Sequence, residues 1–273
     1  AFSGSGLDSV DISANVISIG SGAFASCQQL TSISVDNSNG MYSSVDGVLY
    51  NKEMTTMLQY PAGKASESFT VPGSILNIGD QVFASSTYLE TIMLPEGLLS
   101  IGNGAFNTVS NMISITIPSS VTSIGLEAFM DCSNLSSIIV SEDNLFYADI
   151  DGVLYNKTIT ELIAYPLAKT DTAITILDSV EVIKQSAFML NSTIRSITFN
   201  DTSELLLIEN RAFLYCFGIE SLILPNNPII VGDQAFYYCN ALTSITIGSD
   251  AQLGNRLIAR NDYFVNAYNE YGA

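Results

Sequence analysis

The residues best suited to chemistry in this sequence are its four cysteines, because the chain contains no histidine. They are Cys27, Cys132, Cys216 and Cys239, and each follows a phenylalanine by three residues. A zinc site needs four ligands close together in space, which these widely spaced cysteines do not offer. We therefore expect small, buried and inert thiols, with a Cys216–Cys239 disulfide as the alternative.

Other catalytic arrangements find little support. Ser-His-Asp and Cys-His sets are excluded by the absence of histidine, and no Gly-x-x-x-x-Gly-Lys phosphate loop is present. A pair of carboxylates could hydrolyse a glycoside, and the sequence does not rule this out among its 27 acidic residues. These acids do not recur at a shared position, which favours solvated surface. We predict no enzymatic activity, no catalytic residue and no cofactor.

The segment Asp149-Ile150-Asp151-Gly152 faintly resembles a calcium-binding loop, and Ser44-Val45-Asp46-Gly47 is its earlier copy. An EF-hand loop needs several more oxygen ligands and a closing glutamate. Asp-Gly is also a common turn sequence. We therefore predict a turn that enters a hairpin, and no bound metal.

The sequence contains an internal repeat, and its strands and turns position the cysteines and the Asp-Gly segments. Its phrase is Ile-Gly-x-x-Ala-Phe-x-x-Cys, followed by Leu-x-x-Ile-x-Ile. The phenylalanine recurs at Phe24, Phe83, Phe106, Phe129, Phe188, Phe213 and Phe236. An alternating apolar pair, expected to form a strand, begins at Val10, Ile33, Phe69, Ile92, Ile115, Ile138, Ile174, Ile197, Leu222 and Ile245.

The pairs follow one another mostly at 23 residues and twice at 36, and both long intervals contain the same insert. We predict these inserts, at 45–61 and 150–166, to be hairpins. One coil cannot bury its phenylalanine alone, whereas stacked coils can. The sequence predicts a single repeat solenoid over 1–273, β-dominated within the α/β repeat class. It should have about ten coils of ~23 residues, parallel strands and short helical or 3-10 turns. Residues 258–273 lose the repeat and are predicted to be a C-terminal cap or a truncated end.

The glycine after isoleucine is expected to form a tight turn with positive φ. Lys184 and Glu209 replace it in their coils, so those turns need another geometry or carry strain. Ser86, Val109 and Asn191 replace the cysteine.

The repeat phrases resemble a known family. Val121-Thr122-Ser123-Ile124-Gly125, Ala128-Phe129-x-x-Cys132, Leu135-Ser136-Ser137-Ile138 and Asp151-Gly152-Val153-Leu154-Tyr155 are similar to the BspA-type leucine-rich repeats of bacterial cell-surface proteins. The resemblance covers nearly the whole chain. It implies an exported or surface-displayed protein with a binding or adhesion role and no catalysis. It implies no functional residues, because the repeat motif is a folding motif.

The amino-acid composition limits the classes of molecule that the chain could bind. The formal net charge is −18, from 27 acids and 9 bases, which argues against nucleic acid and anionic membrane surfaces. No apolar run reaches the roughly 20 residues that span a bilayer, and no signal-peptide pattern opens the sequence. We predict an extracellular or cell-surface protein, monomeric and not inserted in a membrane, that binds a protein or glycoprotein.

The candidate binding face is the outward side of the predicted strands, where serine and threonine alternate with a few apolar residues. Repeat proteins often bind across such a face, although serine and threonine also suit any exposed strand. The alternatives are a structural spacer of a larger surface protein and a carbohydrate-binding module. The predicted binding residues are Thr91, Met93, Ser114, Thr116, Ser137, Ile139, Ser196, Thr198, Ser221 and Ile223.

Overall fold

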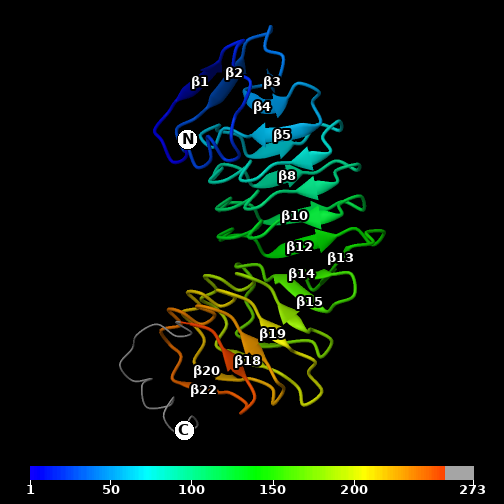
Figure 1. Cartoon of the computed structure of the whole chain (residues 1–273), viewed down its shortest axis with the longest axis vertical. Helices are drawn as coiled ribbons and strands as arrows, with labels where there is room; N and C mark the ends of the chain where they lie inside the picture. The colour runs from blue at the N-terminus through cyan, green and yellow to red at the C-terminus, as the bar shows by residue number, and fades with distance from the viewer. Residues whose placement is uncertain (256–273) are drawn as a thin grey trace. The chain divides into compact units, whose positions relative to one another are not determined.

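The computed structural model describes residues 1–255, so the predicted cap at 258–273 lies outside the described residues. The chain forms two compact units, Ala1–Gly152 and Val153–Ala273, called unit 1 and unit 2 below (Figure 1). Each unit is a stack of coils made of short strands and turns. The described part of the chain contains no helix, and therefore none that could cross a membrane.

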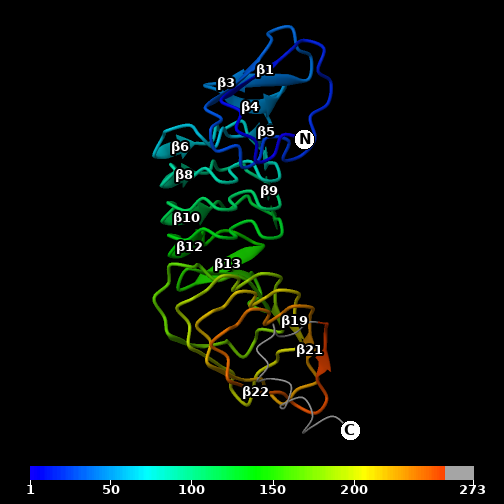
Figure 2. The same ribbon diagram turned by 90° about the vertical axis from the view of Figure 1, so that its left-hand side faces the viewer.

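Unit 1 carries two ladders of strands, which lie on different sides of its coils (Figure 2). Where neighbouring strands of a ladder pair, they are parallel and in register, as where Ile115 lies beside Ile138. The first ladder contains β1 (Ser9–Ile12), β2 (Ser32–Val35), β6 (Ser68–Thr70), β8 (Thr91–Met93), β10 (Ser114–Ile117) and β12 (Ser137–Val140). The second contains β7 (Asn77–Ile78), β9 (Ser100–Ile101) and β11 (Ser123–Ile124).

Unit 2 repeats this arrangement. Its first ladder contains β16 (Ala173–Thr175), β18 (Ser196–Thr198), β20 (Ser221–Ile223) and β22 (Ser244–Thr246). Its second contains β17 (Val182–Ile183), β19 (Leu207–Ile208), β21 (Ile230–Val231) and β23 (Gln252–Leu253). Every alternating apolar pair predicted from the sequence begins in a first-ladder strand, so the predicted solenoid of parallel strands is confirmed.

The core of each unit is a column of stacked aromatic rings. In unit 1 the ring centroids of Phe83 and Phe106 are 5.3 Å apart, and those of Phe106 and Phe129 are 5.5 Å apart. In unit 2 Phe188, Phe213 and Phe236 follow at 4.8 and 5.0 Å. Tyr60 and Tyr165 supply the ring in the coils that carry the inserts. The inward phenylalanine predicted from the repeat is therefore confirmed.

The predicted helical or 3-10 turns are wrong. Around each inward phenylalanine, the residues two before and two after it have positive φ, as at Glu127 and Asp131, both 57°. An L-residue in the left-handed region cannot continue a right-handed helix. The backbone instead donates hydrogen bonds to the next coil, as from Phe106 N to Ala128 O at 2.9 Å and from Thr108 N to Met130 O at 2.9 Å. These stacked segments are called the turn ladder below.

The glycine that follows isoleucine serves a different purpose from the one predicted. Gly102 and Gly125 do not have positive φ. A Cβ added to Gly125 would lie 2.5 Å from the backbone nitrogen of Asn103, and one added to Gly102 would lie 2.5 Å from the carbonyl carbon of Gly79. Glycine is needed here because the backbones of neighbouring coils approach closely, not because the turn is left-handed.

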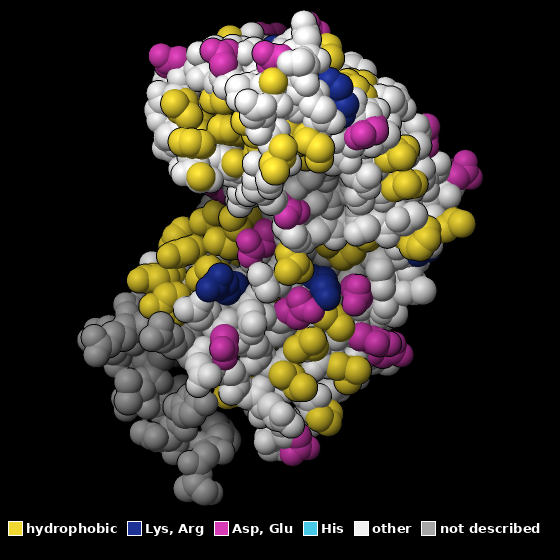
Figure 3. Space-filling view, turned by 45° about the horizontal axis from the view of Figure 1, so that its top comes forward, with side chains coloured by type: hydrophobic (Ala, Val, Ile, Leu, Met, Phe, Trp, Pro, Cys, Tyr) yellow, Lys and Arg dark blue, Asp and Glu magenta, His cyan; other side chains and the backbone are white. Residues whose placement is uncertain are grey.

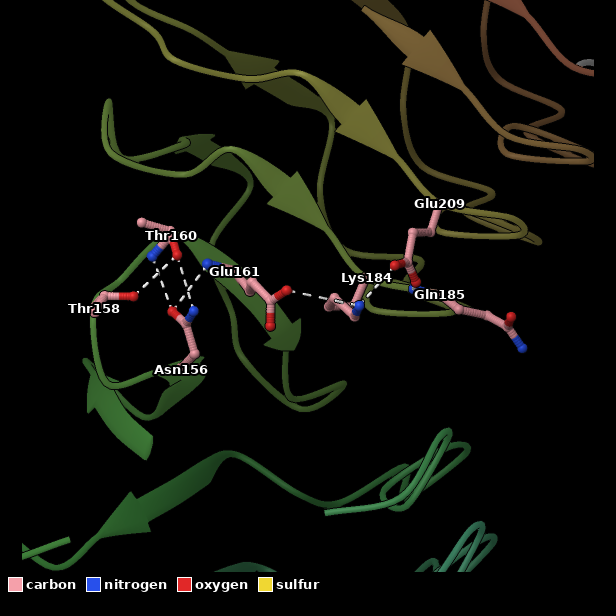
Figure 4. Close-up of polar contacts among 7 residues, drawn as sticks. All are labelled: Asn156, Thr158, Thr160, Glu161, Lys184, Gln185 and Glu209. Atoms are coloured by element: carbon pink, nitrogen blue, oxygen red, sulfur yellow. Dashed lines mark hydrogen bonds and ion pairs between the residues drawn. The ribbon is translucent and has the colours of Figure 1, made fainter. Parts of the chain in front are cut away.

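Two neighbouring coils replace this glycine with a charged pair. The Lys184 ammonium donates to Glu209 Oε1 at 2.6 Å, and the backbone nitrogen of Gln185 donates to Glu209 Oε2 at 2.8 Å (Figure 4). Glu161 lies 3.9 Å from the same ammonium. The two substitutions therefore compensate one another, because each charged side chain finds its partner in the adjacent coil.

The four cysteines are buried and are free thiols, so Cys216 and Cys239 are not bridged. Each thiol donates a hydrogen bond to the carbonyl of a phenylalanine one coil earlier. Cys132 reaches Phe106 O at 3.0 Å, and Cys239 reaches Phe213 O at 3.2 Å. Cys27 and Cys216 make the same contact. The cysteine position thus ties adjacent coils together.

This burial predicts unreactive thiols in the native protein. Desolvation raises the pKa of Cys132 to about 12, so the thiol is neutral at about pH 8, and the thiolate is the nucleophile. We expect iodoacetamide at that pH to label Cys132 slowly in the folded chain and rapidly in guanidinium chloride. Mass spectrometry of the labelled peptide measures both rates. Equal rates in the two conditions would mean that this thiol is accessible in the native coil.

Candidate functional site

The inserts are antiparallel hairpins that begin at the Asp-Gly turns. In unit 1, β3 (Tyr42–Val45) pairs with β4 (Val48–Asn51), which pairs with β5 (Thr56–Gln59). Asp46 and Gly47 have φ of 51° and 79°, as a type I′ hairpin turn requires. Asp151 and Gly152 have φ of 50° and 76°. The turn predicted for Asp-Gly is therefore confirmed.

The second copy of the insert continues from β13 (Tyr147–Ile150) in unit 1 to β14 (Val153–Asn156) and β15 (Glu161–Ala164) in unit 2. The β14–β15 turn is held by the Asn156 side chain (Figure 4). Its Oδ1 accepts from the backbone nitrogens of Thr160 and Glu161, at 2.9 and 3.0 Å. Asn51 makes the same contacts in the first copy. The asparagine that ends the Gly-Val-Leu-Tyr-Asn phrase therefore closes the turn.

In unit 1 the inserts also interrupt the first ladder. The backbone nitrogen of Ile138 on β12 donates to Gly152 O at 2.9 Å, and that of Val140 donates to Asp149 Oδ1 at 2.7 Å. On β2, Ile33 and Val35 donate to Gly47 O and Ser44 Oγ. The hairpin thus takes the place of the next parallel strand, and the uninterrupted part of this face consists of β6, β8, β10 and β12.

Six of the predicted binding residues lie together on this face, which is called the hydroxyl lane below. They come from three successive strands, and β8 and β10 contact each other, as do β10 and β12. Met93 is 50% exposed and Ile139 is 45% exposed, so two apolar side chains stand among hydroxyl groups. The residues of the hydroxyl lane are Thr91, Met93, Ser114, Thr116, Ser137 and Ile139.

Ser137 is the least accessible member of the hydroxyl lane. It is half-buried, and a Cβ built on Gly152 would lie 2.5 Å from its Oγ. The Asp-Gly turn of the second insert therefore packs directly on Ser137. This marks the end of the lane, whereas Ser114 and Thr116 in its middle are exposed.

The other four predicted residues form a separate lane in unit 2. Ser196 lies beside Ser221 in the register of β18 and β20, and Ile223 is 66% exposed. Thr198 shares a hydrogen bond with Thr175 across the ladder, with the hydroxyl oxygens 2.8 Å apart. The predicted face thus divides into two sets of residues, one in each unit.

Two buried asparagines anchor the inserts and were missed by the sequence analysis. Asn144 donates to Pro118 O at 2.8 Å and Val121 O at 3.0 Å, and its Oδ1 accepts from the nitrogens of Phe146 and Tyr147 at 2.8 Å each. Asn39 makes the corresponding four contacts in the first copy. The two inserts begin 105 residues apart in the sequence, and Asn39 and Asn144 are also 105 residues apart. This shared offset is the sequence signal that could have found them.

Comparison with known proteins assigns the fold to a family. The family model of the BspA type leucine rich repeat region matches the chain in 6 copies, over residues 1–62, 60–166 and 167–260. The chain belongs to this family. No curated protein matches the sequence. The BspA-type repeat thus covers both units and both inserts, as the sequence phrases had indicated.

Solved structures of other bacterial proteins share the fold. The pneumococcal vaccine antigen PcpA is 22% identical, with a TM-score of 0.65 over 94% of this chain and 69% of that one. A leucine rich cell surface protein from Faecalibacterium prausnitzii is 24% identical, with a TM-score of 0.62 over 96% of this chain and 81% of that one. A leucine-rich repeat protein from Eubacterium ventriosum is 22% identical, with a TM-score of 0.54 over 90% of this chain and 74% of that one. At these identities the likeness shows the fold alone.

The face of this BspA-type chain drawn in Figure 3 carries more acidic than basic side chains, in line with the 27 acids and 9 bases of the sequence. The hydroxyl lane itself contains no charged residue, so its contacts with a partner would be hydrogen bonds and apolar packing. Within residues 1–255, no group of three or more cysteines and acidic residues is placed to hold a metal ion. The chemistry that the lane offers is binding, through hydroxyl groups that donate and accept hydrogen bonds around the apolar side chains of Met93 and Ile139.

Proposed function

We propose that this BspA-type chain is a non-catalytic, secreted or surface-displayed module that binds a protein or glycoprotein ligand through the hydroxyl lane of unit 1. The observation that carries the proposal is the arrangement of Met93, Thr116 and Ile139. They are exposed, uncharged and held on consecutive strands of one ladder. A rigid row of this kind presents a fixed pattern of apolar and hydrogen-bonding groups, which costs little entropy on binding.

Two further facts support the proposal. Leucine-rich repeat proteins are generally non-catalytic binding scaffolds, and their extended faces are the usual binding surfaces. One structural neighbour is named a leucine rich cell surface protein and another a vaccine antigen, which favours display outside the cell for this chain too. The lack of charge on the lane favours a ligand surface of mixed polar and apolar character.

The test is binding of the purified chain to an array of extracellular-matrix glycoproteins. A Ser114→Arg/Thr116→Arg variant places two long cations in the middle of the hydroxyl lane. The matched control is Thr122→Arg/Ser133→Arg, because both residues are exposed, lie in unit 1 outside the lane, and give the same charge change. We expect saturable binding that is lost in the lane variant and kept in the control.

Equal binding by the two variants would place the ligand on another surface. Failure of the folded native chain to bind any glycoprotein would instead favour a structural spacer, in which the repeats separate other parts of a larger surface protein.

A further inference from the structure

Four aromatic side chains gather on the surface of the turn ladder in unit 2. The rings of Tyr215 and Tyr238 are stacked with centroids 4.9 Å apart, and Phe217 lies 5.8 Å from Tyr215. Tyr237 meets Tyr238 edge-on at 4.4 Å. These rings do not belong to the buried column, because Phe217 is 43% exposed and Tyr238 is 38% exposed.

The backbone conformation at two of these tyrosines is unusual for so large a residue. Tyr215 and Tyr238 both have φ of 60°, in the left-handed region that bulky side chains rarely occupy. Both lie two residues after the inward phenylalanine. Other coils place smaller residues at this position, namely Ser26, Ser85, Thr108, Asp131 and Leu190. The conformation itself belongs to the fold, because every coil with an inward phenylalanine has positive φ at this position. What distinguishes these two coils is the large aromatic side chain that they carry there.

A polar groove of about 470 Å³ is lined by residues of these two coils and of the coils directly before and after them, on the other side of the inward phenylalanine in sequence. The side chains that line it are fixed by contacts between coils. Asn210 Oδ1 accepts from the nitrogen of Asp233 at 2.8 Å, and Arg211 Nε donates to Gln234 Oε1 at 3.0 Å. Its lining residues are Gln185, Asn210, Arg211, Asp233, Gln234 and Asn255.

The two features together indicate the chemistry of a ligand. A sugar ring has a face of C–H groups that packs on aromatic rings, and its hydroxyl groups both donate and accept hydrogen bonds. The tyrosines offer apolar faces with polar edges. The groove offers amides, one guanidinium and one carboxylate, which include donors and acceptors. Arg211 and Asp233 balance in charge, and the net charge of −18 opposes an anionic ligand.

We propose that the turn ladder formed by residues 209–217 and 232–240 binds a neutral oligosaccharide. Tyr215, Tyr238 and Phe217 form the platform for sugar rings, and Arg211, Asp233 and Gln234 bind hydroxyl groups. This site lies in unit 2 and does not depend on the hydroxyl lane, so it can bind a glycan whether or not the lane binds a protein.

The test is affinity electrophoresis of the full chain through gels that contain mannan, a soluble β-1,3-glucan or arabinoxylan. We expect at least one of these polysaccharides to retard the native chain. A Tyr215→Ala/Tyr238→Ala variant should lose affinity by about tenfold or more, because two aromatic contacts are removed. The matched control is Tyr88→Ala, since Tyr88 is 51% exposed and belongs to unit 1. Its retardation should be unchanged.

Further variants and an optical signal keep the test independent of folding. Tyr215→Phe/Tyr238→Phe keeps the rings and should retain binding within a few-fold, and Arg211→Ala should weaken it without touching the platform. The chain has no tryptophan, so tyrosine absorbance reports binding directly. We expect a difference spectrum on adding the retarding polysaccharide to the native chain, and none with the double alanine variant.

Three results would overturn the proposal. The first is that no polysaccharide retards the native chain, and the second is that the Tyr215→Ala/Tyr238→Ala variant is retarded as strongly as the native chain. The third is a tyrosine difference spectrum that a proline-rich peptide produces and no polysaccharide does. The Ser114→Arg/Thr116→Arg variant should be retarded like the native chain. Its behaviour separates the failure of this site from a failure of the hydroxyl lane.

Discussion

Replacing Phe106 by alanine should destabilise the chain by about 3–5 kcal/mol, the range for removing a fully buried phenylalanine. Phe106 is 0% exposed and its ring stacks on Phe83 on one side and Phe129 on the other, at 5.3 and 5.5 Å. Its loss therefore leaves a cavity in the middle of the column. The stacked backbone bonds from Gly104 and Thr108 to the next coil restrict the collapse that could fill it.

Guanidinium chloride denaturation followed by circular dichroism measures this effect. Ser133→Ala is the control, because Ser133 is exposed in a coil next to that of Phe106, and surface changes of this kind stay within about 0.5 kcal/mol. A Phe106→Ala midpoint as high as that of the control would show that the ring column does not stabilise the stack.

Asn144→Ala should have the second largest effect, a loss of about 3 kcal/mol, because a buried polar group left without its partner costs about 1–3 kcal/mol. Asn144 is 0% exposed, and the substitution removes its hydrogen bonds with two carbonyls and two N–H groups. Of these groups, Pro118 O still accepts from the nitrogen of Val121 at 3.3 Å. The strand β13 starts within this network at Tyr147. We therefore expect the second insert to lose its fixed attachment to unit 1.

The same denaturation experiment tests Asn144, with Asn134→Ala as the control because Asn134 is an exposed asparagine of the same unit. Asn144→Asp keeps oxygens that can accept from Phe146 and Tyr147, but it turns a buried carboxylate oxygen toward Pro118 O and Val121 O. At neutral pH it should therefore destabilise the chain at least as much as Asn144→Ala. An Asn144→Ala chain as stable as the Asn134→Ala control would contradict the anchoring role.

The ladder strands and the inward rings were predictable because both follow directly from the types and the spacing of the side chains in the repeat. Alternating isoleucines show which side of a strand is buried, and phenylalanines 23 to 25 residues apart in successive coils show which rings stack on one another. The same logic predicted the hydroxyl lane as a set of neighbours. The Asp-Gly turns were predictable because few residue pairs accept two successive positive φ values.

The turn ladder was not predictable in the same way. Ala-Phe flanked by polar residues is compatible with a helical turn, and residues such as Glu127, Gln234 and Tyr215 are not typical of the left-handed region. What selects that conformation is the next coil, whose carbonyls accept the N–H groups of this one. The role of Gly125 was misjudged for the same reason, since the close approach is to a residue 22 positions away in the sequence.

The inserts give the hydroxyl lane a defined end. They cover the free edge of β12 with Gly152 and Asp149, so they prevent another strand from pairing there. Open strand edges promote aggregation, and the hairpin removes one without extending the face. The hydroxyl lane is therefore a bounded surface centred on Ser114 and Thr116.

Hydrogen–deuterium exchange of the chain, alone and saturated with the array glycoprotein that it binds most tightly, tests the hydroxyl lane as the binding surface most directly. We expect slower exchange on binding in peptides that contain β8, β10 and β12. Protection confined to the inserts or to unit 2, with β8, β10 and β12 unchanged, would contradict the assignment of the ligand to the hydroxyl lane.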